Sequence, residues 1–420
     1  MSKLNVFYEE QKVGELVRDK ELVYSFRYDP NWLKSPERFQ LSLALPLQEE
    51  PFGNKLTLSF FENLLPEGEV RKVLGRDHQI ESSFEFLKEF GKDCAGAIIV
   101  SPNKASAFNS SKSGIRKIEM SKIYEAIEEK RSVAEVISEM EPGYLSLAGA
   151  QDKFPAIHKN RDFYLPTHGG PTTHIIKVPI WRMGISESVY NEYYCMKLAK
   201  SIGLNVPDCF VMGEGEHPLF VIERYDRIID KNNKVHRIHQ QDFCQAQGIV
   251  SEEKYEEKGG PTLKNNYELI LKNVWIKKRA ENSYSFLDWL CFNLLIGNND
   301  GHSKNLSFLL KEEKTELAPF YDLLCTAIYP KLKRQFSFKI GDRNDASRIG
   351  KNQLNLLNDE LALKAGTMIE RMVFMRHKLL EHKDEIATEV LREHSKVKIV
   401  GRISDLIGDR CRSLSRQGIK

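Results

Sequence analysis

The chain has 420 residues, too many for one small hydrophobic core, so two or three domains or lobes are expected. Hydrophobic residues make up 41% and charged residues 29%, an ordinary soluble composition, and no apolar stretch has membrane-spanning length. The amino terminus lacks the apolar segment of a signal peptide. The seven cysteines are scattered without a Cys-x-x-Cys pair, which argues against a disulfide framework and a zinc site and predicts a reducing cytoplasm.

The net charge of +3 conceals a basic carboxyl-terminal region. Residues 371–420 contain 12 Lys and Arg against 7 Asp and Glu, a balance of +5 that leaves −2 on the rest of the chain. A basic end on a near-neutral body is compatible with a polyanionic partner such as nucleic acid. Solvated helices show the same charge pattern, so both interpretations stay open.

The first hundred residues predict a small β-rich subdomain. Apolar runs between polar turns indicate an antiparallel meander with strands at 4–8, 12–16 and 22–28 and a continuation at 41–47. Pro66 and Gly91 end two predicted helices, and a strand and a linker follow; these elements are 58–65, 83–90, 95–100 and 101–113. No residue pattern in this part indicates catalysis, so an accessory or interaction subdomain is expected.

Small residues cluster just before a predicted hairpin. An amphipathic helix is expected at 120–131, and residues 144–153 then read Tyr-Leu-Ser-Leu-Ala-Gly-Ala-Gln-Asp-Lys. Strands are predicted at 154–158 and 163–166. Small residues let a backbone approach a ligand closely enough for its N–H groups to hold phosphate oxygens. Neither the dinucleotide-binding nor the P-loop glycine pattern is present, so a plain hairpin turn is the alternative.

Lys177 occupies the apolar strand predicted at 172–179. Strand alternation places it on the opposite face from its two apolar neighbours, and such a lysine needs a counter-ion or a route to water. The next predicted helix, 187–202, carries Glu192 on its apolar side. A strand lysine and a helix glutamate form the ion pair with which kinases hold the α- and β-phosphates. A structural salt bridge, or two separately solvated side chains, would use the same residues.

Helices dominate the chain after a last predicted buried strand at 219–226, which runs into a charged turn. In a two-lobed nucleotide-binding fold such a segment connects the lobes, and its backbone can read an adenine edge. His236 and His239 lack a carboxylate at a recognised ligand spacing, so solvated histidines are expected. Residues 251–266 predict a polar surface loop, and helices are predicted at 267–275, at 285–296 and over most of 352–420. A β-rich half is thus followed by an α-rich half.

The octet 298–305, Asn-Asn-Asp-Gly-His-Ser-Lys-Asn, lies between the apolar runs 286–296 and 306–310. Asp300 and Asn305 have the Asp-x-x-x-x-Asn spacing of a kinase catalytic loop, in which the aspartate accepts the proton of the attacking hydroxyl and the asparagine binds magnesium. A second metal-binding carboxylate is expected downstream, where Asp322 is well placed. A solvated loop with Asn-Asp-Gly turn chemistry is the alternative.

Seven short motifs together resemble the HipA family of bacterial serine/threonine protein kinases, the toxins of HipBA toxin–antitoxin pairs. They follow the family's order and occupy residues 146–153, 171–179, 191–195, 204–208, 223–226, 300–305 and 319–322. The segments 13–16 and 61–66 resemble the family's accessory subdomain. The resemblance implies an α+β, two-lobed protein-kinase-like fold. Its expected parts are an accessory β/α subdomain at 1–115, a β-rich nucleotide-binding lobe at 116–226, and an all-α lobe with the catalytic loop at 227–420.

The resemblance also implies residue roles. Asp300 corresponds to the catalytic base, Asn305 and Asp322 to the magnesium ligands, and Lys177 to the phosphate-binding lysine, with Glu192 as its ion-pair partner. The other implied ATP-binding residues are Ala148, Gly149, Ala150, Gln151, Asp152, Lys153, Glu223, Arg224, Tyr225, His302, Ser303, Lys304, Tyr321, Leu323 and Leu324. Two departures are visible. Asp152 stands where glutamate is commoner, and residues 332–340 do not align, so the family's DNA contacts are not assigned to residues of this chain.

The implied activity is ATP- and Mg²⁺-dependent phosphorylation of a protein serine or threonine. The implied substrate is an aminoacyl-tRNA synthetase, of which glutamyl-tRNA synthetase is the best-known example, and the outcome is growth arrest. Ser146 corresponds to the serine whose autophosphorylation would add about −1.5 to −2 charge beside the phosphate loop and inactivate the enzyme. The implied partners are a HipB-like helix-turn-helix antitoxin and, through it, operator DNA, with no membrane. The alternatives are a small-molecule kinase of the aminoglycoside-phosphotransferase type and a non-catalytic corepressor.

Overall fold

A computed structural model of the chain describes residues 1–104, 114–141, 144, 148–167, 169–182, 184–213, 217–311 and 314–419. The chain forms two compact units. Unit 1 comprises Met1–Val178, Val221–Ser251 and Phe308–Glu313, and unit 2 comprises Pro179–Phe220, Glu252–Ser307 and Lys314–Lys420. Each unit is therefore assembled from segments far apart in sequence.

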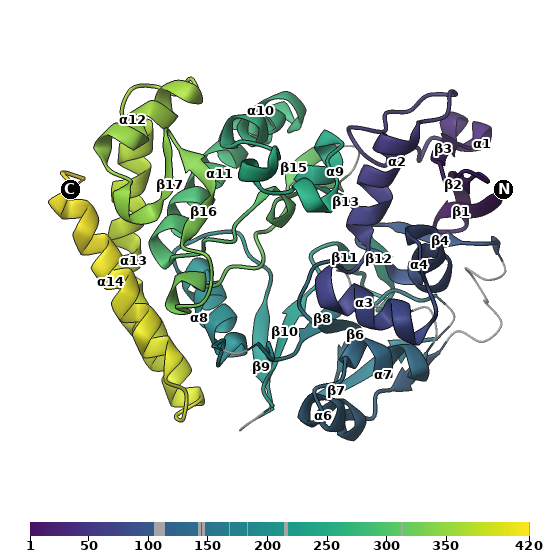
Figure 1. Ribbon diagram of the computed structural model, residues 1–420, viewed down its shortest axis with the longest axis horizontal. Coiled ribbons are helices and arrows are strands. Elements are labelled where there is room, and N and C mark those ends of the chain that lie inside the picture. Colours follow the sequence, from purple (N-terminus) through teal and green to yellow (C-terminus); the bar gives the residue numbers. More distant parts are fainter. Residues whose placement is uncertain are drawn as a thin grey trace. The chain divides into compact units, whose positions relative to one another are not determined.

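Unit 1 begins with a four-stranded sheet of order β3-β2-β1-β4 (Figure 1). Its strands are β1 Ser2–Tyr8, β2 Gln11–Arg18, β3 Tyr24–Tyr28 and β4 Ile98–Ser101, all paired antiparallel. The predicted meander is confirmed, because alternate residues such as Leu4, Val6 and Leu16 are buried on one face. The predicted strand at 41–47 is wrong. Side chains satisfy its backbone, since the Tyr28 hydroxyl donates to the Leu45 carbonyl and accepts from the Leu41 N–H.

Four helices accompany this sheet: α1 Pro30–Lys34, α2 Asn54–Phe61, α3 Gly68–Asp77 and α4 Ser83–Phe90. The α4 helix has the predicted bounds because Ser82 and Glu85 form a capping box at its start. The close approach of Gly91 to β4 explains the glycine that ends it, since a Cβ there would lie 2.4 Å from the Val100 carbonyl oxygen. The α3 helix was not predicted, because Pro66 lies just before it and Gly68 is its first residue.

Unit 1 contributes the strands β5-β7-β6-β8-β10, in this order, to a second sheet. These strands are β5 Ile115–Lys117, β6 Lys153–Lys159, β7 Asp162–Pro166, β8 His174–Lys177 and β10 Leu219–Glu223, and the helices α6 Met120–Glu128 and α7 Val133–Met140 precede β6. The remaining elements are β11 Arg227–Ile229, β12 Val235–Arg237, β13 His239–Asp242, α9 Phe243–Gln247 and β14 Ser307–Lys311. The predicted hairpin 154–166 and the strand bearing Lys177 are confirmed.

Unit 2 is mainly helical. Its helices are α8 Ser188–Ser201, α10 Leu263–Asn273, α11 Ile276–Ile296, α12 Lys351–Glu360, α13 Thr367–Glu393 and α14 Ile399–Arg416. The α13 and α14 helices lie side by side (Figure 1), and both pack against α8 and α11. Helical spacing explains the packing, because α14 buries Ile399, Ile403 and Ile407 at intervals of four residues.

The expectation of an all-α second half is wrong in detail. Residues after 226 include β11 to β14 in unit 1, and β15 Lys314–Leu317, β16 Gln335–Ile340 and β17 Arg343–Asp345 in unit 2. The physical reason is visible in β16, where Phe336, Phe338 and Ile340 alternate as buried residues. Within the described residues, no helix is both long and apolar enough to cross a membrane.

Candidate active site

The octet predicted as a catalytic loop begins where α11 ends. Gly297 adopts a φ of 78°, a left-handed conformation that glycine tolerates, and its N–H donates to the Asn293 carbonyl at 3.1 Å. Two buried amides then fix the loop: the Asn298 Nδ2 donates to Asn293 Oδ1 at 2.7 Å, and Asn298 Oδ1 accepts from the Asp300 N–H at 3.2 Å. The side chains of Asn293 and Asn298 therefore hold the loop backbone in place.

Asp300 is exposed at the surface of this loop. Its Oδ1 accepts a hydrogen bond of 2.7 Å from the hydroxyl of Tyr255. Across the described part of the chain, no other side chain donates to its carboxylate. Asp300 thus has the access to solvent that a base for an incoming hydroxyl requires.

Asn305 and Asp322 lie together in unit 2. The Asn305 Nδ2 donates to Asp322 Oδ2 at 3.1 Å, and the Asn298 Nδ2 donates to the Asp322 carbonyl at 3.3 Å. Asp322 has a φ of 59°, a conformation that costs a non-glycine residue about 1–2 kcal/mol and that clusters at functional sites. The structure therefore brings the predicted base loop and both predicted metal ligands together.

The chemistry of this donor set fits Mg²⁺. A carboxylate and a carboxamide oxygen are hard ligands, and Mg²⁺ in phosphoryl-transfer sites is held by one or two such groups while phosphate oxygens and water complete the octahedron. The hydrogen bond between Asn305 and Asp322 occupies the amide nitrogen and leaves the amide oxygen as the ligand atom. Within the described residues there is no cluster of three or more His, Cys, Asp and Glu side chains that would indicate a protein-only metal cage.

The neighbouring predicted residues are largely buried and hydrogen-bonded. The Ser303 hydroxyl exchanges hydrogen bonds with the buried amide of Asn266 at 2.9 and 3.2 Å. The Tyr321 hydroxyl donates to the Lys304 carbonyl at 2.7 Å, which joins the two segments 302–305 and 321–324 that were predicted to line the nucleotide. His302, Ser303, Lys304 and Leu323 are buried, whereas Leu324 is half-buried.

Unit 1 brings the predicted phosphate loop and strand lysine together. Lys153 of β6 and Lys177 of β8 are directly opposite each other in the antiparallel ladder, so their side chains leave the same face of the sheet. Both are 7% exposed. Gly149 has a φ of 115°, and a Cβ there would lie 2.7 Å from the Lys153 Nζ. Two buried lysines on one face of the sheet, one of them next to Gly149, form an environment suited to a polyanion.

Other predicted loop residues have structural tasks. The Asp152 carboxylate accepts from the Val133 and Ala134 N–H groups at 2.8 and 3.4 Å and so caps α7. Burial raises the pKa of Asp152, although these donors oppose the shift. The Gln151 Nε2 donates to the Val178 carbonyl at 2.9 Å, and Ala148 and Ala150 are at least partly exposed. The side chains of Gln151 and Asp152 are thus used to build the loop.

The predicted hinge contains a buried ion-pair cluster. Arg224 contacts Asp93 and Asp226, each at 2.9 Å, and its N–H donates to the Thr173 carbonyl at 2.9 Å. Burial alone would raise the pKa of Asp93, but the guanidinium groups of Arg224 and Arg227 outweigh it and hold that pKa below its usual range. The Arg224 side chain is therefore structural, and exposed Glu223 and half-buried Tyr225 flank it on the segment predicted to meet adenine.

The contacts described above do not test two predictions, the ion pair of Lys177 with Glu192 and the autophosphorylation of Ser146. Glu192 is buried in α8 of unit 2, whereas Lys177 belongs to unit 1, and the ion pair between them stays a prediction. Ser146 lies outside the described residues, so its autophosphorylation also stays a prediction.

Comparison with known families identifies both halves of the chain. The model of the HipA-like C-terminal domain matches residues 145–391, and the model of the HipA N-terminal domain matches residues 4–101. The first match alone spans more than half of the chain. This chain belongs to the HipA family.

Individual relatives agree with this assignment. The serine/threonine-protein kinase toxin HipA of Shewanella oneidensis is 30% identical over 377 residues, which cover 86% of this chain and 83% of that protein. The protein Y4mE of Sinorhizobium fredii is 36% identical over 349 residues, 81% of each chain. The solved structure of S. oneidensis HipA with HipB and operator DNA superposes with a TM-score of 0.82 at 26% identity and covers 97% of this chain and 96% of that one. The predicted kinase-like α+β fold and serine/threonine protein kinase class are confirmed.

One site residue was missed by the sequence prediction for this HipA-family chain. Residues 251–266 were expected to be a surface loop, but they form the 3₁₀ turns η4 Ser251–Glu253 and η5 Glu256–Lys258 and the start of α10. Tyr255, between the two turns, reaches Asp300. The glycine pair Gly259-Gly260 is typical of a turn, but nothing in the sequence indicates which loop the turn contacts.

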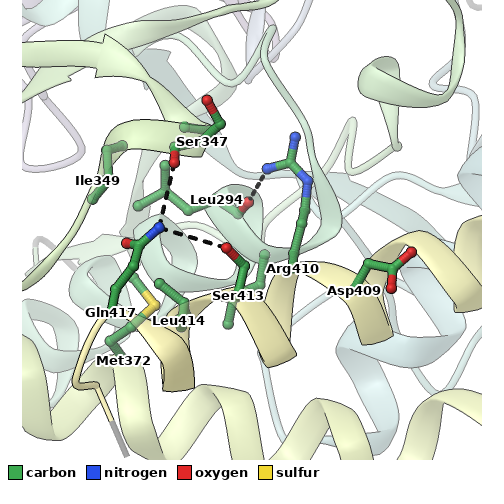
Figure 2. A pocket seen from close by; sticks show the side chains of 11 residues that line it. Leu294, Ser347, Ile349, Met372, Asp409, Arg410, Ser413, Leu414 and Gln417 are labelled. Carbon is green, nitrogen blue, oxygen red and sulfur yellow. Dashed lines mark hydrogen bonds between the residues drawn. The ribbon is translucent and has the colours of Figure 1, made fainter.

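A cavity of about 250 Å³ elsewhere in unit 2 contains none of the predicted site residues (Figure 2). It is lined by α14, α11 and the segment around Ser347, and Figure 2 shows Arg410 donating to the Leu294 carbonyl, a bond of 2.7 Å. The Gln417 Nε2 makes long contacts of 3.4 and 3.5 Å with the Ser347 carbonyl and the Ser413 hydroxyl.

Proposed function

We propose that this chain transfers the γ-phosphoryl group of ATP to a serine or threonine of a protein, with Mg²⁺ as the metal. The observation that carries the proposal is the assembly of Asp300, Asn305 and Asp322 in unit 2 of a HipA-family chain. Asp300 accepts the proton of the acceptor hydroxyl as its oxygen bonds to the γ-phosphorus. The bond from that phosphorus to the β,γ-bridging oxygen breaks, and its electron pair leaves with ADP.

Asn305 and Asp322 would hold the metal. A bound Mg²⁺ neutralises charge on the phosphate oxygens and orients them, which is most of what a loose phosphoryl-transfer transition state needs. In unit 1, Lys153 and Lys177 would bind phosphate oxygens, and the backbone of residues 148–150 would approach them. The backbone on either side of Arg224 would contact the adenine, with Glu192 as the partner of Lys177.

We also propose a substrate and binding partners for this chain. The S. oneidensis relative is a serine/threonine-protein kinase toxin, and its structure was solved with HipB and operator DNA. This supports a HipB-like antitoxin and operator DNA as partners here, a corepressor role and a cytoplasmic location. We propose an aminoacyl-tRNA synthetase similar to glutamyl-tRNA synthetase as the substrate, with growth arrest as the outcome and autophosphorylation of Ser146 as the means of inactivation.

Radiolabelled ATP tests the proposed reaction. Wild-type protein with Mg²⁺ is expected to label a protein in a bacterial lysate, and mass spectrometry identifies the labelled protein and its acceptor residue. Asp300→Ala should lose at least about 100-fold of the transfer rate, because the base is absent, while ATP binding measured by calorimetry persists. Asp405→Ala, at an exposed position of α14, is the matched control and should behave as wild type.

The result also separates the alternatives. Full transfer by Asp300→Ala would contradict its role as the base. Labelling of small alcohols or aminoglycosides without any protein would instead favour a small-molecule kinase. Equal ATP affinity with and without Mg²⁺, and no transfer by the wild type, would leave the corepressor function alone.

A further inference from the structure

We propose that Tyr255 is a positioning residue that holds the catalytic carboxylate of Asp300 in its working orientation; this inference depends on the proposed kinase function. The Tyr255 hydroxyl donates to Asp300 Oδ1 at 2.7 Å. Within the described residues the other carboxylate oxygen, Oδ2, accepts no hydrogen bond from the protein. A carboxylate with one oxygen fixed and one open can accept a hydroxyl proton at a defined place.

Tyr255 is itself held rigidly by the turn that contains it. Its carbonyl oxygen accepts from the N–H groups of Lys258 and Gly260, both at 3.0 Å. A Cβ at residue 260 would lie 2.0 Å from the Glu253 carbonyl oxygen and 2.8 Å from that of Tyr255, so only glycine permits this close return of the chain. The tyrosine is therefore fixed through its own backbone.

Side chains around the turn attach it to the rest of unit 2. The Glu256 carboxylate accepts from the Lys339 N–H of β16 at 2.8 Å, and Glu257 forms an ion pair with Lys333. The Tyr255 ring packs edge-on against the buried ring of His302 at 5.1 Å, two residues after Asp300. The Tyr255 hydroxyl therefore reaches Asp300 from a turn that is fixed to β16, to Lys333 and to His302.

The geometry distinguishes a positioning role from a blocking one. A tyrosine that blocked the site as a substitute substrate would have to leave before an acceptor hydroxyl could bind. Tyr255 occupies only Oδ1, and its turn is pinned by backbone, ring and ion-pair contacts, so we infer that it stays in place during the reaction. A hydrogen bond to the carboxylate also restricts rotation of an exposed side chain, which shortens the search for the reactive geometry.

Tyr255→Phe tests this role, because it removes one oxygen and leaves the ring packing. We expect kcat for protein phosphorylation to fall about 10- to 100-fold, while the KM for ATP and the Kd for Mg²⁺-ATP stay within about twofold of wild type. Tyr284→Phe is the matched control, since Tyr284 is 51% exposed and far along α11 from the loop. Thermal melting should show all three proteins folded alike.

A second readout does not depend on transfer. In protein labelled with ¹³C at aspartate carboxyls, the Asp300 resonance is assigned by its loss in Asp300→Asn. It should move in Tyr255→Phe and not in Tyr284→Phe. An unmoved resonance, or a moved resonance with wild-type kcat, overturns the positioning role, and a raised kcat would show that Tyr255 blocks the site. A moved resonance in a protein that transfers no phosphate would refute the kinase function but keep the contact.

Discussion

Asp322 combines a left-handed backbone with a proposed metal-binding carboxylate, and the two properties can be separated by substitution. Asparagine adopts a positive φ more readily than most residues and keeps an oxygen that Asn305 can donate to. The free energy of unfolding of Asp322→Asn in urea should therefore lie within about 0.5 kcal/mol of the wild-type value. Its rate of phosphoryl transfer should nevertheless fall on the order of 100- to 1000-fold, because the anionic ligand is gone.

Asp322→Ala provides the comparison. It loses both the ligand and the tolerance of positive φ, so it should be about 1 kcal/mol less stable than Asp322→Asn while showing a similar loss of transfer. Equal stability of the two variants would show that the left-handed conformation carries no cost at this position. Wild-type transfer by Asp322→Asn would contradict the proposed metal ligand.

At the residue scale the sequence predicted reactive groups that the structure brings together, but not the residues that support them. The Asp-x-x-x-x-Asn spacing predicted Asp300 and Asn305. In the structure Asn305 donates to Asp322, and Asn298 contacts both Asp300 and Asp322. Tyr255 could not be predicted, because its contact with Asp300 spans 45 residues and carries no local pattern. The task of Asp152 as a helix cap was equally hidden, since the helix that it caps lies 19 residues earlier in the chain.

At the element scale, α14 has a glycine that the helix does not require. A Cβ at Gly401 would meet no atom within 4 Å, whereas one at Gly408 would lie 3.2 Å from Arg412 Nη1 and 3.3 Å from Lys383 Cε. Gly401→Ala should stabilise the protein by about 0.5–1 kcal/mol in urea unfolding, because alanine restricts the unfolded chain and favours the helix.

Gly408→Ala is the matched variant in the same helix. Its new methyl group must displace two side chains, so the gain should be smaller than that of Gly401→Ala or absent. A larger gain at residue 408 than at 401 would contradict the packing of α13 against α14.

Elements with clear periodicity were predictable, whereas those stabilised by tertiary contacts were not. The α4 and α8 helices and the hairpin of β6 and β7 have bounds within a few residues of the prediction because apolar spacing and turn residues agree. Residues 41–47 have the apolar content of a strand, but Tyr28, Gln241 and Gln245 supply their hydrogen-bond partners from a distance. Such partners cannot be inferred from the segment itself.

At the scale of the whole molecule, the accessory part of the HipA-type chain and the segments next to β8 and β10 share one buried polar network inside unit 1. Asp93 follows α4, yet it pairs with Arg224 and Arg227 at 2.9 Å and accepts from the Thr172 N–H at 3.3 Å. These side chains are almost fully buried, so removing one partner would leave an uncompensated charge. The accessory region is therefore part of the scaffold that fixes the proposed hinge.

Unit 1 also buries His239, which was expected to be solvated, and His174 of β8. His239 is 4% exposed, its ring stacks on Phe39 at 4.5 Å, and its Nε2 lies 2.8 Å from the Leu41 carbonyl oxygen. Burial lowers the pKa of His239 to about 4, and burial with the neighbouring His158 lowers the pKa of His174 to about 4. Both imidazoles are therefore neutral in the folded protein at neutral pH. For His239, the local sequence around 236–239 could not reveal this.

These histidines should make stability depend on pH before the carboxylates titrate. Between pH 6.5 and 4 these imidazoles bind protons in the unfolded chain but stay neutral in the folded chain. The free energy of unfolding therefore falls as the pH falls. Because of each histidine, the free energy of unfolding measured in urea should be about 1–2 kcal/mol lower at pH 5 than at pH 7.5. His239→Gln keeps a donor for Leu41 and should abolish its share of the loss, whereas His377→Gln, at an exposed position of α13, should not. An identical pH dependence in wild type and His239→Gln would show that His239 does not stay neutral.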